Sequence, residues 1–286
     1  MSGRTLFIVN PVSARRHKLD QDRFRTSLDR RGLDHQIVEW QTANNNKYDL
    51  QDIDLADFQR IVVVGGDGTV NEVLNATYTH GREYGLIPLG SGNGLGRSLG
   101  IPRSAEKALD IIEKGDSRLL DLGAMNERLF INVAGMGFDA EVAQAFGRTS
   151  RGFIGYVIEV VRLYFDAREG RYSITTSEGQ MELDAFLISI ANGDQWGNNF
   201  YIARGARFDD GLLDVVAMKK PALYQIPSLL QALLRRKNHK LMQTFASDRF
   251  SIERPNTSAV HFDGEPMEGE KSLEIRCIPG AVRVLC

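Results

Sequence analysis

The chain has 286 residues, enough for two domains with separate cores, and its 42% apolar and 25% charged content is typical of a globular protein. The formal net charge of −2 argues against broad nucleic-acid binding, which needs a positive face. Its two cysteines, Cys277 and Cys286, have neither metal-site spacing nor a disulfide framework. Without an apolar signal region after Met1 or an apolar run of about 18 residues, we expect a cytoplasmic protein, soluble or peripheral to a membrane.

The first part of the chain alternates predicted strands and helices. Apolar runs and helical spacing predict strands over 5–9, 35–40, 61–64 and 85–89, and helices over 19–31, 69–78 and 105–114. This βαβ alternation indicates an α/β domain over residues 1–122.

The pattern changes in residues 123–286, where short strands with turn signals between them predominate. We predict helices over 139–146 and 152–165, and strands over 130–134, 172–176, 183–191, 213–218, 249–252, 259–262, 272–277 and 281–285. Such a pattern predicts an antiparallel β-sandwich domain, and its last strand could return to the first domain.

A glycine-rich turn, Gly65-Gly66-Asp67-Gly68-Thr69, follows the third predicted strand and opens a helix. Backbone N–H groups of Gly65, Gly66 and Gly68 could cradle phosphates beside the positive end of the helix dipole, although a plain βα turn also explains the glycines. A carboxylate beside phosphates needs a cation such as Mg²⁺, which suggests that role for Asp67. Thr69 and Glu72 have the spacing of a capping box, so Glu72 is read first as a helix cap and second as a nucleotide contact.

Three further polar loops follow the other predicted strands of this domain. Because parallel strands present their carboxyl ends at one edge, we expect the second glycine-rich loop, residues 90–97, to meet the first in one crevice. Loop chemistry alone is the competing explanation for their residues. The resulting candidates for nucleotide contact, besides the glycine turn, are Asn10, Ser13, Thr42, Ser91, Gly92 and Asn93.

These loops, together with Gly137-Phe138-Asp139, Asp210-Gly211-Leu212-Leu213-Asp214 and Asp263-Gly264-Glu265, resemble the diacylglycerol kinase catalytic-domain superfamily. The best match is to the soluble bacterial lipid kinases, which include diacylglycerol kinase-like and sphingosine kinase-like members. The resemblance implies a three-layer α/β ATP-binding domain, similar to those of phosphofructokinases and NAD kinases, and a β-rich lipid-substrate domain. It also implies transfer of the ATP γ-phosphate to a lipid hydroxyl, with Mg²⁺, at a cleft between the domains.

The same resemblance assigns roles to individual carboxylates. Glu265 is the expected general base and Asp263 the alternative, whereas composition alone favours a plain hairpin turn there. Asp67 is expected to act in catalysis through Mg²⁺, with Asp121 as a supporting metal ligand and Asp210 as a ligand of a structural divalent ion. A cap residue and a bare turn are the competing readings of Asp121 and Asp210. Gly94 departs from the family pattern, which usually has an Asp at that position.

A lipid substrate requires access to a membrane. Residues 224–234 are apolar with helical spacing, and a basic cluster, residues 235–240, follows them. This pattern fits transient docking on the inner face of an anionic membrane, and it also fits a core helix with a basic end. A homodimer is possible. The alternative functions are a kinase for NAD or a sugar on the same fold, and a non-catalytic nucleotide-binding regulator, which Gly94 would favour.

Overall fold

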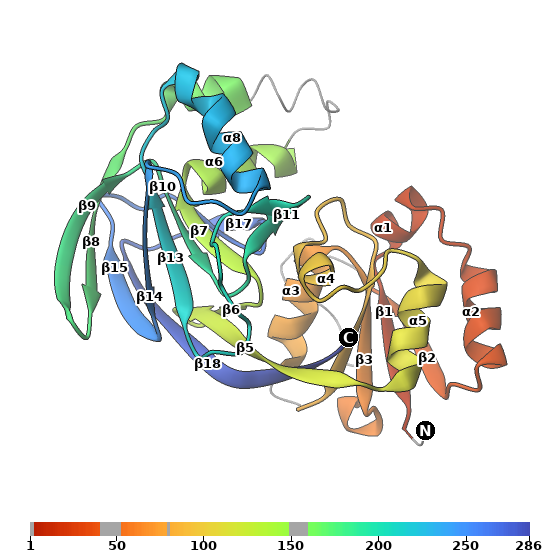
Figure 1. Ribbon diagram of the computed structural model, residues 1–286. Helices are drawn as coiled ribbons and strands as arrows, with labels where there is room; N and C mark the ends of the chain where they lie inside the picture. Colours follow the sequence, from red (N-terminus) through yellow and green to blue (C-terminus); the bar gives the residue numbers. More distant parts are fainter. Residues whose placement is uncertain (1–2, 41–52, 79–80, 149–159) are drawn as a thin grey trace. The chain divides into compact units, whose positions relative to one another are not determined.

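The computed structural model describes residues 3–40, 53–78, 81–148 and 160–286 (Figure 1). The chain forms two compact units. Unit 1 comprises Met1–Leu120 and Gly280–Cys286, and unit 2 comprises Asp121–Pro279. The chain therefore leaves unit 1 once and returns to it at its last strand.

Unit 1 is built on a parallel sheet in the order β2-β1-β3-β4, and the end of β18 lies parallel to β4 through Arg283 and Val284. All four strands were predicted. Three of them, β1, β3 and β4, carry the apolar run expected of a buried parallel strand, whereas β2 is only half-buried. The strands are β1 (Thr5–Val9), β2 (His35–Glu39), β3 (Arg60–Gly65) and β4 (Glu83–Pro88). The connecting elements are α1 (Pro11–Arg16), α2 (Gln21–Arg30), η1 (Leu55–Asp57), α3 (Asp67–Thr77), α4 (Gly94–Ser98) and α5 (Ala105–Lys114).

Register places alternate residues of these strands on opposite faces of the sheet. Phe7, Val62 and Gly85 are in register on one face. There Phe7 packs edge-on against Phe24 of α2, and Gly85 leaves room for Ile112 of α5. On the opposite face, the hydroxyl of Tyr84 is bonded to that of Thr77 on α3. Helices thus cover both faces, and the predicted three-layer α/β arrangement is confirmed (Figure 1).

Unit 2 contains two sheets packed face to face. One has the strands β8 (Gly170–Thr176), β9 (Gly179–Ala185), β15 (Arg249–Glu253) and β18 (Ser272–Leu285), joined by β5 (Ser117–Met125) and β6 (Arg128–Phe130). The second has the order β14-β13-β10-β7-β16-β17 and comprises β7 (Val133–Gly137), β10 (Leu187–Ala191), β13 (Leu213–Met218), β14 (Met242–Ser247), β16 (Ala259–Phe262) and β17 (Glu265–Glu268). A small third ribbon pairs β11 (Gln195–Gly197) with β12 (Phe200–Tyr201).

The core of unit 2 lies between the two large sheets. Ile174, Ile252 and Ile275 from the first sheet pack in one buried cluster with Ile188 and Val215 from the second. This is the predicted β-sandwich, because alternate residues of each strand point into a shared apolar layer.

Helices cover the outer face of the second sheet. They are α6 (Phe138–Arg148), the helical residues 160–166, η3 (Leu223–Gln225) and α8 (Ile226–Leu234). Val216 and Met218 of the sheet pack with Leu229 and Leu233 of α8 on this side.

Two predicted strand boundaries in this unit were wrong. The predicted strand 183–191 is divided at Phe186, whose N–H donates to the Met218 carbonyl and whose ring stacks on Phe138 at 4.5 Å. The predicted strands 272–277 and 281–285 form the single strand β18, which continues through Pro279 and Gly280. Proline and glycine signal a turn in sequence, but the backbone stays extended here because both ends of β18 pair with neighbouring strands.

Arg31 joins α2 to α5 through three carboxylates that recur along one face of α5. Its guanidinium lies 3.0 Å from Glu106 and 2.7 Å from both Asp110 and Glu113, and the side chain is 18% exposed. The Ser27 hydroxyl and Arg31 together lower the pKa of Glu106. This carboxylate therefore stabilises the fold at neutral pH, and its contribution is lost as pH falls below about 4.

We predict that Arg31→Ala lowers the free energy of unfolding by about 1–2 kcal/mol at pH 7 and by less near pH 3, because three carboxylates lose their shared cation. Thermal unfolding at both pH values measures this. Arg25→Ala, an exposed change on the same helix, is the control and should have little effect. Equal losses from the two variants would contradict the role given to Arg31.

Candidate functional site

Asp67 joins the two glycine-rich loops of unit 1. It is the first residue of α3, separated from β3 by Gly66 alone, and its carboxylate reaches the beginning of α4 in the second loop. One carboxylate oxygen accepts the Gly94 N–H at 3.0 Å and the other accepts the Leu95 N–H at 3.3 Å. Gly94, where the family resemblance led us to expect an Asp, therefore supplies a backbone donor to Asp67.

Glycines allow the two loops to approach backbone to backbone. A Cβ atom on Gly66 would lie 3.0 Å from the Gly90 Cα, and one on Gly90 would lie 2.6 Å from the Gly66 Cα. A Cβ on Gly65 would meet the Thr69 side chain at 2.8 Å. Contacts this short are not compatible with a side chain, so loop packing accounts for part of the glycine content that the sequence assigns to phosphate binding.

Asn10 connects the first polar loop to the glycine turn. Its carboxamide oxygen accepts the N–H groups of Val12 and Ser13 and so caps α1, while its amide nitrogen donates to the Thr69 hydroxyl at 2.9 Å. The predicted loop at Asn10–Ser13 is thus the beginning of a helix. This corrects the expectation of a plain loop, and the strong N-cap preference of Asn was the signal for it.

The predicted capping box at Thr69 and Glu72 is wrong. The helix begins two residues earlier, at Asp67, with Gly66 as its N-cap and no side-chain cap hydrogen bond. Glu72 instead accepts the indole N–H of the buried Trp40 at 2.8 Å. Thr42, also predicted to contact nucleotide, lies outside the described residues.

Asn93 shapes the second loop from within. It has a left-handed backbone (φ +49°), is 2% exposed, and bonds through both ends of its side-chain amide to the backbone of Gly90. The Gly92 carbonyl accepts from Arg97, whereas Ser91 is exposed at the tip of the loop. Of the three residues in this loop that were predicted to contact the nucleotide, Ser91, Gly92 and Asn93, only Ser91 is exposed.

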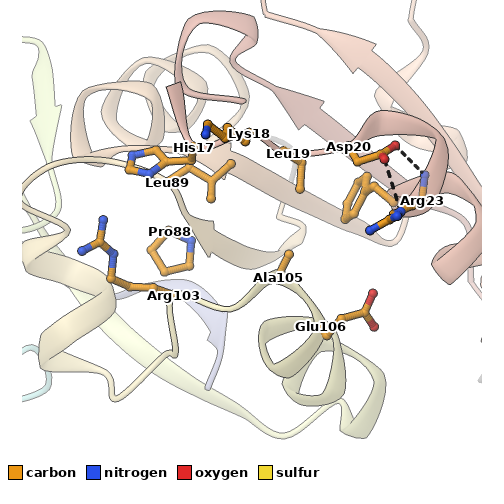
Figure 2. A pocket seen from close by; sticks show the side chains of 11 residues that line it. His17, Lys18, Leu19, Asp20, Arg23, Pro88, Leu89, Arg103, Ala105 and Glu106 are labelled. Atoms are coloured by element: carbon orange, nitrogen blue, oxygen red, sulfur yellow. Dashed lines mark hydrogen bonds and ion pairs between the residues drawn. The ribbon is translucent and has the colours of Figure 1, made fainter. Parts of the chain in front are cut away.

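A cavity of about 450 Å³ borders the second loop, and none of its lining residues was predicted (Figure 2). Leu89 precedes Gly90 directly, and Arg103 donates to the Gly90 carbonyl at 3.4 Å. Lys18, Arg23 and Arg103 outnumber Asp20 and Glu106 in the lining. Arg23 pairs with Asp20, and Arg31 from outside the lining pairs with Glu106. The cavity therefore has a positive balance of charge at the carboxyl edge of the sheet.

In unit 2, the two predicted metal carboxylates lie at one turn. Asp121 is 3% exposed and accepts the Gly211 N–H at 2.7 Å, and exposed Asp210 accepts the Leu212 N–H at 3.1 Å. Burial, and to a smaller degree the charge of Asp210, raises the pKa of Asp214 to about 6. In the part of the chain that the structure describes, no three His, Cys, Asp or Glu side chains cluster as a protein-built metal site would require.

The turn Asp263-Gly264 connects β16 to β17 as a two-residue hairpin, with φ values of +51° and +90°. Positive φ at both residues is the type I′ geometry, for which Asp-Gly is a preferred pair. The Asp263 carboxylate accepts three backbone N–H groups, from Ile131, Asn132 and Val133, at 2.8–3.0 Å. Asp263 thus holds the hairpin to the segment before β7, and Glu265 is exposed at the beginning of β17.

A buried pair beneath this hairpin was missed by the sequence reading. His261 Nε2 lies 3.1 Å from an Asp139 carboxylate oxygen, and the Gly264 N–H reaches His261 Nδ1 at 3.4 Å. Gly135 makes room for the pair, because a Cβ there would lie 2.4 Å from Asp139 and 2.6 Å from His261. Asp139 and His261 are 122 positions apart, and no local pattern links them.

Comparisons with known proteins cover both units. The diacylglycerol kinase catalytic domain matches residues 4–125, and the YegS C-terminal NAD kinase beta sandwich-like domain matches residues 132–286. A probable lipid kinase YegS-like protein of Pseudomonas aeruginosa is 32% identical over 86% of this chain and 82% of its own length. Lipid kinase YegS of Escherichia coli K12 is 28% identical over 87% of this chain and 85% of its own length.

Solved structures share the fold. A putative diacylglycerol kinase from Bacillus anthracis superposes with a TM-score of 0.76 at 22% sequence identity, covering 100% of this chain and 98% of that one. No helix among the described residues combines the length and apolar character needed to cross a membrane. Two domain models match the chain, and the relatives cover most of it. The chain therefore belongs to the YegS-like lipid kinase family, whose catalytic domain is of the diacylglycerol kinase type.

Proposed function

We propose that this protein transfers the γ-phosphate of ATP, with Mg²⁺, to a hydroxyl of a diacylglycerol-like or sphingoid lipid at the inner face of the membrane. The observation that carries the proposal is the pair of hydrogen bonds between the two glycine-rich loops. Through these bonds Asp67 holds the start of α4 next to the N-terminus of α3. Phosphoryl transfer depends mainly on positioning phosphates and neutralising their charge, which such an arrangement serves.

Three features favour ATP phosphates at this place. The loops follow the carboxyl ends of parallel strands, where open α/β sheets bind ligands. The first turn of α3 lacks a side-chain cap, which suits N–H donation from Gly66, Gly68 and Thr69 to phosphate oxygens. Asn10, Ser13, Ser91, Gly92, Asn93 and Glu72, with Thr42, are proposed to border the rest of the nucleotide.

Asp67 is the proposed protein ligand of Mg²⁺ or of its waters. Each of its oxygens accepts one of the two backbone bonds described above, and an ionised carboxylate can accept from several partners at once. Mg²⁺ usually takes one or two carboxylates together with substrate phosphates, so this donor set fits the ion without a prebuilt cluster. When bound, the ion would neutralise charge on the transferred group.

A second divalent ion at Asp210 belongs to the proposal, with Asp121 supporting its turn. Asp210 is exposed, and Asp214 lies near enough for its pKa to be raised by the Asp210 charge as well as by burial. A cation there would relieve the repulsion between these carboxylates, and backbone carbonyls could complete its ligands.

Glu265 is the proposed general base. It is exposed on β17, and the Asp263 bonds and the His261–Asp139 pair fix the hairpin that carries it. Asp263, the alternative base, already accepts three backbone N–H groups, so its carboxylate is better suited to holding the turn than to accepting a proton from a substrate. A homodimer stays a prediction.

We expect Asp67→Asn to lower ATP-dependent lipid phosphorylation by roughly 100-fold or more, because the neutral amide cannot hold Mg²⁺. The assay uses labelled ATP and a total lipid extract, identifies the product by mass, and includes NAD and sugars as competing acceptors. Asp57→Asn, an exposed change in the same unit, is the control and should leave the rate unchanged. Phosphorylation of NAD or a sugar but of no lipid would overturn the lipid assignment.

Glu265→Gln should lower kcat by about 10²–10⁴-fold with little change in KM for ATP, because the amide cannot accept the hydroxyl proton. Glu268 is a matched control, since it is also exposed on β17. Steady-state kinetics on the phosphorylated lipid compare Glu265→Gln with Glu268→Gln. Similar activity in the two variants would remove Glu265 from the mechanism.

Asp263→Ala should act first on stability. The three backbone N–H groups that it accepts lose their acceptor. We expect this loss to lower the free energy of unfolding by about 2–4 kcal/mol, as measured by chemical denaturation. Asp248→Ala, an exposed change in the same unit, serves as the control. A variant with unchanged stability but no activity would instead identify Asp263 as the base.

A further inference from the structure

The segment from η3 through α8 has an apolar inner side and an apolar outer side. Leu229 and Leu233 pack inward against the second sheet of unit 2. On the outer side, Leu223, Leu230 and Leu234 are 58%, 43% and 51% exposed. With exposed Pro227 they recur at helical spacing, so they share one face. Tyr224, 81% exposed, lies at the N-terminal end of this face.

The helical residues 160–166 extend this apolar surface. Val161 and Phe165 are 49% and 63% exposed and lie four positions apart, on one side of that helix. The two segments are joined, because the Tyr164 hydroxyl donates to the Pro221 carbonyl and the Lys220 ammonium lies 4.8 Å from the Tyr164 ring centroid. Of the ten exposed large hydrophobic side chains in the described residues, six belong to these two segments.

The charge around this surface is one-sided. Residues 215–247 contain six Lys or Arg and no Asp or Glu, in a chain of net charge −2. Two of these cations have internal partners: Lys220 donates to the Ala167 carbonyl, and Arg236 pairs with Asp194 at 3.2 Å and stacks on Tyr201. The other four, Lys219, Arg235, Lys237 and Lys240, are exposed.

The neighbouring residues 160–169 contain two Arg and two acidic side chains, so this segment leaves the positive charge in place. Asp166 pairs with Arg162 at 3.9 Å on its own helix, and Glu169 accepts the backbone N–H of Lys220. An apolar face with cations at one end is the pattern of a helix that lies in the interface of an anionic bilayer. Tyrosine at the other end also suits that interface, where its ring and hydroxyl meet different environments.

We propose that this docking face, Leu223, Tyr224, Leu230 and Leu234 with Val161 and Phe165, inserts into the interfacial layer of an anionic lipid bilayer. Arg235, Lys237 and Lys240 then contact the headgroup phosphates, while Arg236 stays on Asp194 and Tyr201. The proposal deepens the proposed function, because it names the surface from which a lipid kinase would reach its acceptor.

The test is co-sedimentation of the full chain with vesicles, without ATP. Wild-type protein should bind phosphatidylcholine–phosphatidylglycerol vesicles, bind pure phosphatidylcholine vesicles far more weakly, and lose affinity as salt is raised. Leu230→Gln with Leu234→Gln should weaken binding roughly tenfold or more. Arg235→Gln with Lys237→Gln should weaken binding to the anionic vesicles roughly tenfold or more as well.

Two controls on the same unit match these changes. Met181→Gln alters an exposed apolar residue of β9, and Lys271→Gln removes an exposed cation outside the docking face. Both should bind like wild type, and melting temperatures check that every variant is folded. Equal binding of the double variants and wild type overturns the proposal, as does equal or absent binding of wild type to the two vesicle types.

Phosphorylation of lipid dispersed in detergent micelles separates this proposal from the proposed function. The Leu230 and Leu234 double variant should keep wild-type turnover on micelles, which deliver lipid without a bilayer, and lose it on vesicles. If wild type binds anionic vesicles but phosphorylates no lipid in either form, the docking surface stands and the kinase assignment fails. If turnover on vesicles survives the double variant, the docking surface fails alone.

Discussion

The geometry of unit 1 depends on one carboxylate placed at the start of a neighbouring helix. Asp67 accepts the N–H groups of Gly94 and Leu95, which α4 cannot satisfy within itself. The bond fixes the separation of two loops that follow different strands, and the close contact of Gly66 with Gly90 permits no side chain between them. A phosphate site made of backbone donors needs this fixed spacing, because a flexible loop would have to be ordered by the ligand.

In unit 2, too, a carboxylate accepts backbone N–H groups from a distant segment. Asp263 accepts three backbone N–H groups from the segment that leads into β7, and so orients a two-residue turn. Beneath it, His261 and Asp139 occupy space that Gly135 leaves. In both units the Asp of a glycine-containing turn, Asp67 or Asp263, holds another segment through its backbone N–H groups. The residue type alone does not reveal this structural function. Residues beside it, such as Glu265, are left exposed.

The parts of the fold with strong local patterns could be predicted. The apolar runs of β1, β3 and β4, the glycine turn, and the Asp-Gly hairpin follow from short-range chemistry. The partners of Glu72, Asp263 and His261 could not be predicted, because each bond joins residues that are far apart in sequence. The Thr69–Glu72 spacing placed the start of the helix two residues too late, since Gly66 needs no side chain to begin α3. Neither Arg103 nor the cavity that it lines has a sequence signature.

Strand β18 ties the folding of the two units to the order of synthesis. Residues 280–286 leave the ribosome only after all of unit 2 has been made, yet they belong to unit 1. Val282, Val284 and Leu285 are at most 3% exposed, so unit 1 lacks part of its core until then. Until β18 arrives, β4 has an open edge that could pair with another chain. The edge of β4 is therefore exposed to aggregation from the time it is made until the last residues of the chain pair with it.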